Sequence, residues 1–405
     1  MAGQKVIRGE VIAIGDELTT GQRLDTNTQW LSQRLTELGV TVVAHTTVAD
    51  DLDLNRDAFA AAAERAELVV CTGGLGPTAD DLTRDALAAA AGVSLVTDAA
   101  ALAHVESLYR SRGREMPPQN RRQAEFPEGA TPIANLGGTA PGVDFQFGDA
   151  RVFALPGVPA EMKQMWAETV GPTLYDVTKD VGVMRHHLVK CFGVGESQLE
   201  AMLPDLFTRG REPQVGITAS KATITLRVTA RGADEAACRE AMQPTLQCVR
   251  ETLGDLIYAE CGPENEIELH TAVVDELAER RLTVATSEAM TGGLLGHWLA
   301  EADDDRGAFA GGVLRLPTGA AVDAAAAEQE AVALRDGGAT FGVVVGAMGS
   351  VEPAQVIVAA AGPDSVESKR VILVGHPSIH RSLVSKHAIN LVRQMLLGLP
   401  GGVAA

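Results

Sequence analysis

Aromatic side chains and positive charges are both scarce in this chain of 405 residues. Aromatic residues make up 4% of it, so its core must be built mainly from alanine, valine and leucine, which is typical of compact α/β domains. The chain has 34 lysines and arginines against 53 aspartates and glutamates, a net charge of −19. This shortage of positive charge argues against a general nucleic-acid-binding protein, although it leaves local phosphate binding open.

Cysteine pairs and long apolar runs are also missing. The five cysteines show no C-x-x-C pair and no zinc spacing, so we expect free thiols in a reducing cytosol. No apolar run reaches the roughly 18 residues that a membrane-spanning helix needs, and no signal peptide precedes the first strand-like segment. We therefore expect a cytoplasmic protein without a membrane or nucleic-acid partner.

Strand-like and helix-like segments alternate through residues 1–171. We expect strands at 6–14, 40–47, 67–71 and 151–155, and helices at 25–38, 54–66, 82–90 and 160–169. This order predicts a doubly wound, mostly parallel sheet. Residues 172–262 predict a small α+β module. Cys261-Gly262-Pro263 then marks a break before a further α/β domain at 263–405.

The most informative segment is residues 70–81, which read Val-Cys-Thr-Gly-Gly-Leu-Gly-Pro-Thr-Ala-Asp-Asp. Its glycines are Gly73, Gly74 and Gly76, and its candidate helix caps are Thr78, Asp80 and Asp81. A glycine loop between a strand and a helix N-terminus attracts phosphate, and adjacent carboxylates favour a divalent cation. The alternative is a tight turn with an aspartate cap. The loop matches neither the Walker motif nor the dinucleotide fingerprint.

Two further polar segments follow predicted strands. Ligands of doubly wound sheets bind beyond the carboxyl ends of the strands. Asp16 and Glu17 follow the first strand and either complete a metal site or cap a turn. The segment Leu155-Pro156-Gly157-Val158-Pro159 follows the strand at 151–155, and we expect its prolines to set loop geometry.

Several of these segments, with three others, resemble the CinA family (competence/damage-inducible protein A) in order and spacing. They are 15–18, 26–31, 72–81, 120–124, 138–142 and 155–162. The resemblance covers the whole chain. It implies a molybdopterin-binding-like first domain, a small middle module, and a C-terminal domain similar to nicotinamide mononucleotide deamidases.

For the first domain the resemblance implies a metal-dependent pyrophosphatase that splits ADP-ribose or related NAD-type nucleotides into AMP and ribose 5-phosphate. It also implies a divalent cation (Mg, Mn or Co), leaves potassium open as a further cation, and implies a homodimer. The implied catalytic residues are Asp80 and Asp81, and the implied metal ligands are Asp16, Glu17 and Asp81. The implied substrate-binding residues are Asn27, Gly73, Gly74, Gly76, Thr78, Asn120, Arg121, Thr139 and Gly157.

Alternatives to these assignments remain. The run Asn120-Arg121-Arg122 can be a solvated surface segment. The first domain can also be a non-catalytic module that holds a nucleotide or a pterin-like ligand, because fold does not fix function. The tandem carboxylates Asp80 and Asp81 favour the enzyme.

The C-terminal domain departs from the active deamidases that it resembles. Their Ala-Glu-Ser-Cys-Thr-Gly-Gly run corresponds to 287–293 here, so Ala289 stands where the expected nucleophilic serine would be. Leu316 replaces their tyrosine, and Ala321 replaces their lysine. Amide hydrolysis by a nucleophile needs a hydroxyl and a base beside it. We therefore predict a degenerate deamidase, kept for oligomerisation, stability or ligand sensing; deamidation of nicotinamide mononucleotide is the competing hypothesis.

Overall fold

A computed structural model describes residues 6–179, 181–316, 323–348, 354–373 and 375–399. The chain divides into two compact units. Unit 1 comprises Met1–Arg185 and Arg231–Glu240, and unit 2 comprises His186–Ala230 and Ala241–Ala405. Within the described residues, no helix is both long and apolar enough to cross a membrane.

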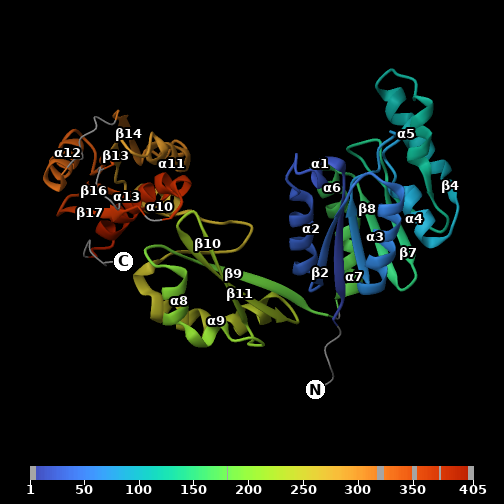
Figure 1. Ribbon diagram of the computed structural model, residues 1–405, viewed down its shortest axis with the longest axis horizontal. Helices are drawn as coiled ribbons and strands as arrows, with labels where there is room; N and C mark the ends of the chain where they lie inside the picture. The colour runs from blue at the N-terminus through green and yellow to red at the C-terminus, as the bar shows by residue number, and fades with distance from the viewer. Residues whose placement is uncertain (1–5, 180, 317–322, 349–353, 374, 400–405) are drawn as a thin grey trace. The chain divides into compact units, whose positions relative to one another are not determined.

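Unit 1 is built on a six-stranded sheet of order β2-β1-β3-β8-β7-β6 (Figure 1). The strands are β1 (Arg8–Ile14), β2 (Thr41–Val48), β3 (Leu68–Thr72), β6 (Thr131–Ile133), β7 (Gly142–Phe147) and β8 (Ala150–Leu155). The strands β2, β1, β3 and β8 are parallel to one another. Strand β7 is antiparallel to β8, and β6 is antiparallel to β7. The predicted doubly wound, mostly parallel sheet is confirmed.

Alternate residues of the central strands enter two separate cores, one on each face of the sheet. Ile12, Val69 and Cys71 pack against α3 (Leu52–Arg65) and α4 (Thr83–Ala91). The residues next to them in the chain point to the other face of the sheet and pack against the helices there. These residues are Val11, Leu68 and Val70. Helices on that face are α2 (Thr26–Glu37), α6 (Pro159–Met165) and α7 (Gly171–Thr178), the last two joined by a π-helical turn at Trp166–Val170.

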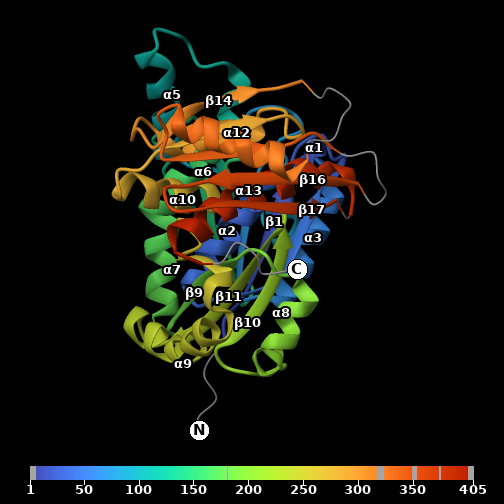
Figure 2. The same ribbon diagram turned by 90° about the vertical axis from the view of Figure 1, so that its left-hand side faces the viewer.

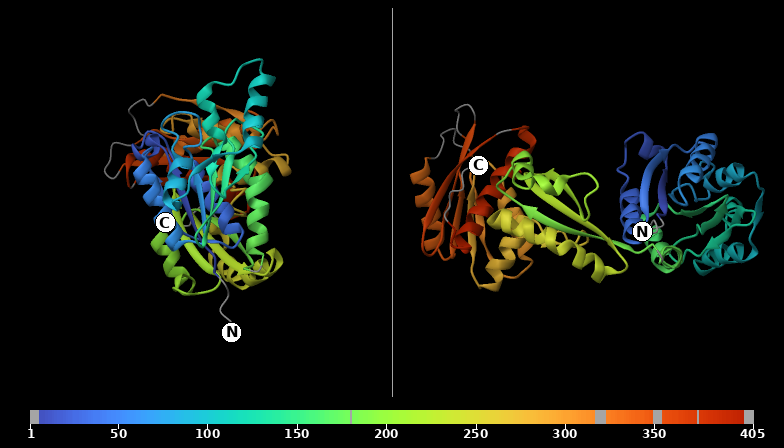
Figure 3. Two further views of the ribbon diagram at one scale, coloured as in Figure 1. Left: turned by 90° about the vertical axis from the view of Figure 1, so that its right-hand side faces the viewer. Right: turned by 90° about the horizontal axis from the view of Figure 1, so that it is seen from below.

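A small subdomain extends from one end of this sheet (Figures 1 and 3). It contains β4 (Leu95–Thr97), α5 (Ala99–Ser111), a 3-10 turn at Pro118–Ala124 and β5 (Glu125–Pro127). Helix α5 begins where the Asp98 carboxylate accepts a hydrogen bond of 2.7 Å from the Ala101 N–H. The Asp25 and Asp51 carboxylates cap α2 and α3 in the same way.

One ion pair crosses the α3 side of the sheet. The Glu10 carboxylate on β1 is fully buried and receives two hydrogen bonds, of 2.6 and 2.7 Å, from the half-exposed Arg65 guanidinium at the end of α3. The Thr46 hydroxyl donates a third bond of 2.7 Å. A buried carboxylate is tolerated only when it is fully paired, so these partners fix α3 against β1 and β2.

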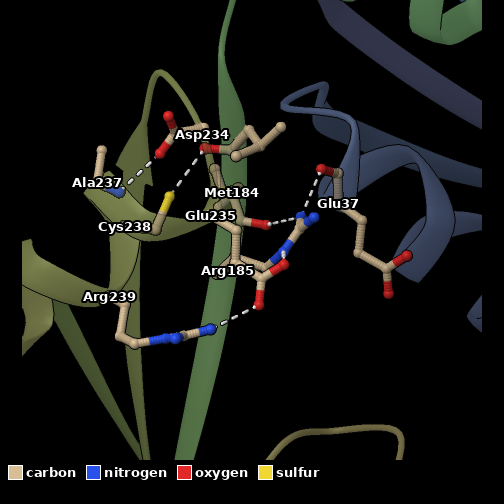
Figure 4. A network of polar contacts seen from close by, with 9 residues as sticks. Glu37, Met184, Arg185, Asp234, Glu235, Ala237, Cys238 and Arg239 are labelled. Atoms are coloured by element: carbon tan, nitrogen blue, oxygen red, sulfur yellow. Dashed lines mark hydrogen bonds and ion pairs between the residues drawn. The ribbon is translucent and has the colours of Figure 1, made fainter.

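Unit 1 also holds the first six residues of helix α9 (Glu235–Leu253), and the rest of this helix belongs to unit 2 (Figure 4). Arg185 on β9 (Val183–Cys191) donates to the Glu37 carbonyl over 3.0 Å and lies 4.0 Å from the Glu235 carboxylate. The Cys238 thiol donates to the Val183 carbonyl over 3.4 Å. These contacts attach the start of α9 to the end of α2.

Unit 2 contains two sheets. The first is antiparallel, of order β10-β11-β9-β12, with α8 (Glu196–Met202) and α9 on one face (Figure 1). Its other strands are β10 (Gln214–Ser220), β11 (Thr223–Gly232) and β12 (Ile257–Cys261). This matches the small α+β module that the sequence predicts.

The second sheet is mixed, of order β14-β13-β15-β16-β17. Its strands are β13 (Val284–Glu288), β14 (Phe309–Leu314), β15 (Phe341–Val345), β16 (Gln355–Ala361) and β17 (Val366–Ile372). Its helices are α10 (Leu269–Glu279), α11 (Leu294–Asp303), α12 (Ala324–Asp336) and α13 (His380–Leu396). Helix α12 packs on one face, and the other three pack on the opposite face (Figure 2).

The two sheets of unit 2 share a core. Phe192 and Tyr258 of the antiparallel module belong to the same apolar cluster as α10, α11 and α13. Two buried lysines add polar links, because Lys190 and Lys386 lie 3.7 and 3.2 Å from the Glu268 carboxylate. The module and the C-terminal domain therefore form one packed body.

Protonation of His387 should destabilise unit 2 in mild acid. This side chain packs edge-on against Phe192 at 5.0 Å, and burial, with a smaller contribution from Lys369, lowers its pKa to about 4. Between pH 6.5 and about 4 the unfolded chain binds the proton and the folded chain does not, so stability falls as the pH falls through this window. At about 1.4 kcal/mol per tenfold difference in proton affinity, the full effect is about 3 kcal/mol.

Thermal unfolding measured at pH 7 and pH 4.5 tests this. His387→Gln should reduce the difference between the two pH values. His297→Gln, at an exposed position on α11, should keep it. An equal pH effect in the wild type and His387→Gln would contradict the assignment.

Removal of Arg65 should cost more than removal of the whole Glu10–Arg65 pair. Arg65→Ala leaves the buried Glu10 carboxylate without its guanidinium and should destabilise unit 1 by about 3 kcal/mol. The double variant Glu10→Val with Arg65→Ala leaves no buried charge and should be the more stable of the two. Urea unfolding of both variants measures the order, and the reverse order would refute this account.

Candidate functional site

A cavity of about 490 Å³ opens at the carboxyl ends of β1, β3 and β8. Its walls are formed by the loops that follow these strands, where ligands of doubly wound sheets bind. Most of the site residues expected from the sequence line it: Glu17, Gly73, Gly74, Gly76, Asp80, Asp81, Thr139 and Gly157. The structure thus brings together segments more than a hundred residues apart.

The glycine loop forms the floor of this cavity through close backbone contacts. Gly73 has a φ of 109°, and a Cβ atom there would lie 2.2 Å from the Ile14 carbonyl oxygen. Its N–H donates to the Leu155 carbonyl over 3.0 Å, so the ends of β1, β3 and β8 meet at this one residue. A Cβ atom on Gly76 would lie 2.4 Å from the Asp81 carboxylate. Gly73 therefore requires glycine, whereas a side chain at Gly76 would displace the Asp81 carboxylate.

The two aspartates of the loop have different surroundings. Asp81 Oδ2 accepts hydrogen bonds from the Thr78 N–H (2.8 Å) and the Thr78 hydroxyl (2.5 Å), so it holds the loop closed. Asp80 is open to solvent. The nearby Thr78 hydroxyl, the backbone N–H of Asp80 itself and the charge of Arg122 lower the pKa of the Asp80 carboxyl. Asp80 is therefore an ionised carboxylate at neutral pH that faces the cavity.

The prediction that Thr78, Asp80 or Asp81 caps the next helix is wrong. Helix α4 begins after Leu82, and no side chain caps it. The Asp81 carboxylate is directed back to Thr78, because the loop makes its own turn before the helix begins. The alternative interpretation of this segment as a simple capped turn therefore does not describe the structure.

Arg84 places a buried positive charge beneath the loop. Its side chain is 3% exposed and donates to the Leu75 and Pro141 carbonyls over 3.1 and 3.0 Å. Burial lowers its pKa to about 10, so the guanidinium remains charged at neutral pH, close to Asp81. Sequence analysis missed it. The available signal was an arginine on the same helical face as Leu87 and Ala88.

Asp16 and Asp50 join the ends of β1 and β2. Each carboxylate accepts a hydrogen bond from the other residue's N–H, over 2.9 and 3.1 Å. Asp16 does not line the cavity, whereas Asp50 and Glu17 do. Burial and the repulsion of Asp16, Glu17 and Asp80 raise the pKa of Asp50. Sequence analysis did not select Asp50, although it lies just beyond a predicted strand end, as Asp16 does.

The cavity offers oxygen donors suited to a hard cation. Glu17 lies in the short helix that follows β1, and Asp50 and Asp80 lie in two loops. The mutual repulsion of these carboxylates is the kind that a cation relieves. In the described part of the chain no three His, Cys, Asp or Glu side chains converge closely enough to hold a metal alone. Magnesium commonly keeps several waters and binds through one or two carboxylates with substrate phosphates, so this donor set fits such an ion.

Asn27 lies in a smaller cavity of about 50 Å³ that shares Glu17, Arg23 and Gly157 with the larger one. The Asn27 amide donates to the Thr72 hydroxyl (3.1 Å) and to the Gly157 carbonyl (2.9 Å). The Thr72 hydroxyl in turn donates to the Pro156 carbonyl over 3.0 Å. Asn27 therefore links the loop after β8 to the end of β3. Both of its amide hydrogens are donated to other residues of the protein.

In the segment 120–123, the residue that lines the cavity is not one of the two that were predicted from the sequence, Asn120 and Arg121. Asn120 is buried and donates to the Tyr109 hydroxyl (2.8 Å) and to Gln123 (2.9 Å). Arg121 is exposed, whereas Arg122 donates to the Thr78 carbonyl and pairs with Asp85 at 3.0 Å. Gln123 is the one that lines the cavity. Arg122 thus supports the glycine loop from outside.

In the C-terminal domain, Ala289 follows strand β13 directly, and its N–H donates to the Val345 carbonyl over 3.0 Å. The neighbouring Glu288 is buried and accepts hydrogen bonds from the Thr291 hydroxyl and from two N–H groups at the start of α11, those of Leu295 and Gly296. Leu316 is 84% exposed. Ala321 lies outside the described residues. The Glu288 carboxylate, next to Ala289, therefore holds the start of α11 against the end of β13.

Comparison with known families agrees with this organisation. Residues 10–176 match a family model described as a probable molybdopterin binding domain. Residues 186–259 match one described as the damage-inducible protein CinA KH domain. These two ranges correspond to the mostly parallel sheet of unit 1 and to the antiparallel module of unit 2.

Individual relatives extend the match over the full chain. A CinA-like protein of Frankia casuarinae is 34% identical over 429 aligned positions, which cover 97% of each chain. A putative competence-damage inducible protein of Oceanobacillus iheyensis is 35% identical and covers 76% of this chain and 73% of its own. A solved structure, described as CinA with unknown function from Thermoplasma acidophilum, is 36% identical, covers 41% of this chain and 98% of its own, and has a TM-score of 0.39. The resemblance drawn from the sequence motifs is confirmed, and the chain belongs to the family of CinA-like proteins.

Proposed function

We propose that unit 1 hydrolyses the pyrophosphate bond of ADP-ribose or a related NAD-type dinucleotide, releasing AMP and ribose 5-phosphate. The observation that carries this proposal is the presence, in one cavity, of the backbone loop at Gly74–Gly76 and the carboxylates Glu17, Asp50 and Asp80. The loop suits a phosphate group, and the carboxylates suit a metal and a water molecule.

Each part has a task in pyrophosphate hydrolysis. The loop N–H groups and the buried charge of Arg84 stabilise negative charge on one phosphate. The ionised Asp80 orients a water molecule, whose oxygen bonds to phosphorus as the bridging P–O bond breaks and its proton passes to the phosphate products. Asp81 keeps the loop in the conformation that this requires.

A divalent cation would be held by Glu17, Asp50 and Asp80 together with the substrate's phosphate oxygens. When bound, such an ion neutralises phosphate charge and makes a coordinated water more acidic. Without it, a diphosphate would meet an excess of carboxylates on the cavity walls, so catalysis should depend strictly on the metal.

The alternative for unit 1 is a non-catalytic module that binds a nucleotide or a pterin. The match to a probable molybdopterin binding domain is the observation that favours this alternative. The five carboxylates that line this cavity weigh against it, because a module that only holds an anion gains nothing from nearby negative charge.

For the C-terminal domain we propose that deamidase chemistry has been lost. Ala289 carries no hydroxyl, and Leu316 has no group that transfers a proton. The Glu288 carboxylate is already engaged by three hydrogen-bond donors. The fold itself is intact, so a role in stability, oligomerisation or ligand sensing is compatible with these replacements.

Asp80→Asn should abolish metal-dependent release of AMP from ADP-ribose. Loss of the oriented water and of one metal ligand should lower kcat by about a hundredfold or more. The assay uses full-length protein with Mg²⁺, Mn²⁺ or Co²⁺, and EDTA should abolish activity.

Asp149→Asn makes the same chemical change at an exposed turn between β7 and β8 and should retain wild-type activity. Binding of ADP-ribose by the wild type without turnover, under any of these metals, would assign unit 1 to the non-catalytic class.

The full-length protein should release no ammonia from nicotinamide mononucleotide. If ammonia is released, the loss of deamidase chemistry is refuted. Ser287→Ala would then show whether Ser287, whose buried hydroxyl has no hydrogen-bond partner among the described residues, has taken over as nucleophile.

A further inference from the structure

The larger cavity and the smaller one beside Asn27 share a wall, and charge is distributed very unevenly over it. Five carboxylates line the larger cavity: Glu17, Asp50, Asp80, Asp81 and Glu161. The smaller one is lined by Glu17 and Asp25. In the part of the chain that the structure describes, Arg23 is the single cationic side chain that lines either cavity, and it lines both.

Arg23 is also available for a ligand. Its backbone N–H donates to the Glu17 carbonyl over 3.0 Å, which closes the turn after α1 (Asp16–Thr19) and places Arg23 next to Glu17. Its guanidinium is exposed and has no hydrogen-bond or ion-pair partner among the described residues. Arg122, by contrast, is already paired with Asp85 and the Thr78 carbonyl, and Arg84 is buried under the loop.

We propose that Arg23 selects a diphosphate ester over a monophosphate in this cleft. This inference rests on the proposed function. The glycine loop can hold one phosphoryl group through its N–H groups, and a second phosphoryl group would then face the shared wall. The guanidinium fork of Arg23 pairs with phosphate oxygens and offsets part of the carboxylate repulsion there. Binding of a monophosphate at the loop alone does not depend on the Arg23 guanidinium.

Loss of Arg23 should therefore weaken binding of the intact substrate more than it slows the chemical step. In Arg23→Gln we expect the KM for ADP-ribose to rise about ten- to a hundredfold, with kcat within about threefold of the wild type. Arg23→Lys should recover part of the affinity, since it keeps the charge but loses the fork. Raising the salt concentration should shrink the difference between Arg23→Gln and the wild type.

Two comparisons make the test specific. Arg114→Gln removes the same charge from an exposed position of unit 1 outside both cavities and should leave KM unchanged. Inhibition by AMP, a monophosphate product bound at the loop, should be nearly equal in Arg23→Gln and the wild type. An unchanged KM in Arg23→Gln, or an equal rise in Arg114→Gln, overturns the proposal.

The same variants separate failure of this inference from failure of the proposed reaction. If the wild type shows no turnover, calorimetric titration of ADP-ribose in Mg²⁺ replaces the kinetic assay. Weaker binding by Arg23→Gln than by Arg114→Gln then supports the role of Arg23 in a binding module. Equal affinities, or no binding by the wild type, overturn it.

Discussion

The candidate site depends on the contact of three strand ends at Gly73. Because there is no side chain at this position, the chain can turn directly beneath the Ile14 carbonyl at the end of β3. The Gly73 N–H donates to the Leu155 carbonyl at the same point. Any larger residue would push β1 away from β3 and open the floor of the cavity. The loops that carry Glu17, Asp80 and Gly157 then face one another without further adjustment. The geometry of the site is therefore set by backbone packing, and the polar side chains occupy positions that this packing creates.

Charge gives the site its second constraint. The carboxylates that line the cavity repel one another, and this repulsion adds to the effect of burial in raising the pKa of Asp50. The cavity is therefore best suited to a ligand that arrives with a cation. The positive groups nearby are placed to support the loop, Arg84 from below and Arg122 from outside, which leaves Arg23 facing the cavities. An anionic substrate and a metal would thus neutralise each other inside the cleft.

Much of this arrangement can be predicted from the sequence, for identifiable reasons. Short apolar runs, buried on both faces of the sheet, give β1 and β3, and the glycine loop follows β3, so fold class and the centre of the site are local signals. Asp50, Arg84 and Arg23 were missed because their roles arise from segments that meet only in the folded chain. Asn27 illustrates the same limit: its residue type suggests a ligand contact, while its amide hydrogens bind Thr72 and Gly157. The edge strand β10 gives no comparable sequence signal, because its exposed residues form no apolar run.

The shared core of unit 2 has a consequence for how this chain can evolve. Phe192 and Tyr258 of the antiparallel module are covered by helices of the C-terminal domain, and Lys190 and Lys386 meet at Glu268. A gene truncated after the module would leave these aromatic rings and a buried lysine exposed to water. Mutations that remove a catalytic hydroxyl carry no such penalty. Selection can therefore discard the chemistry of the last domain while still retaining the domain itself.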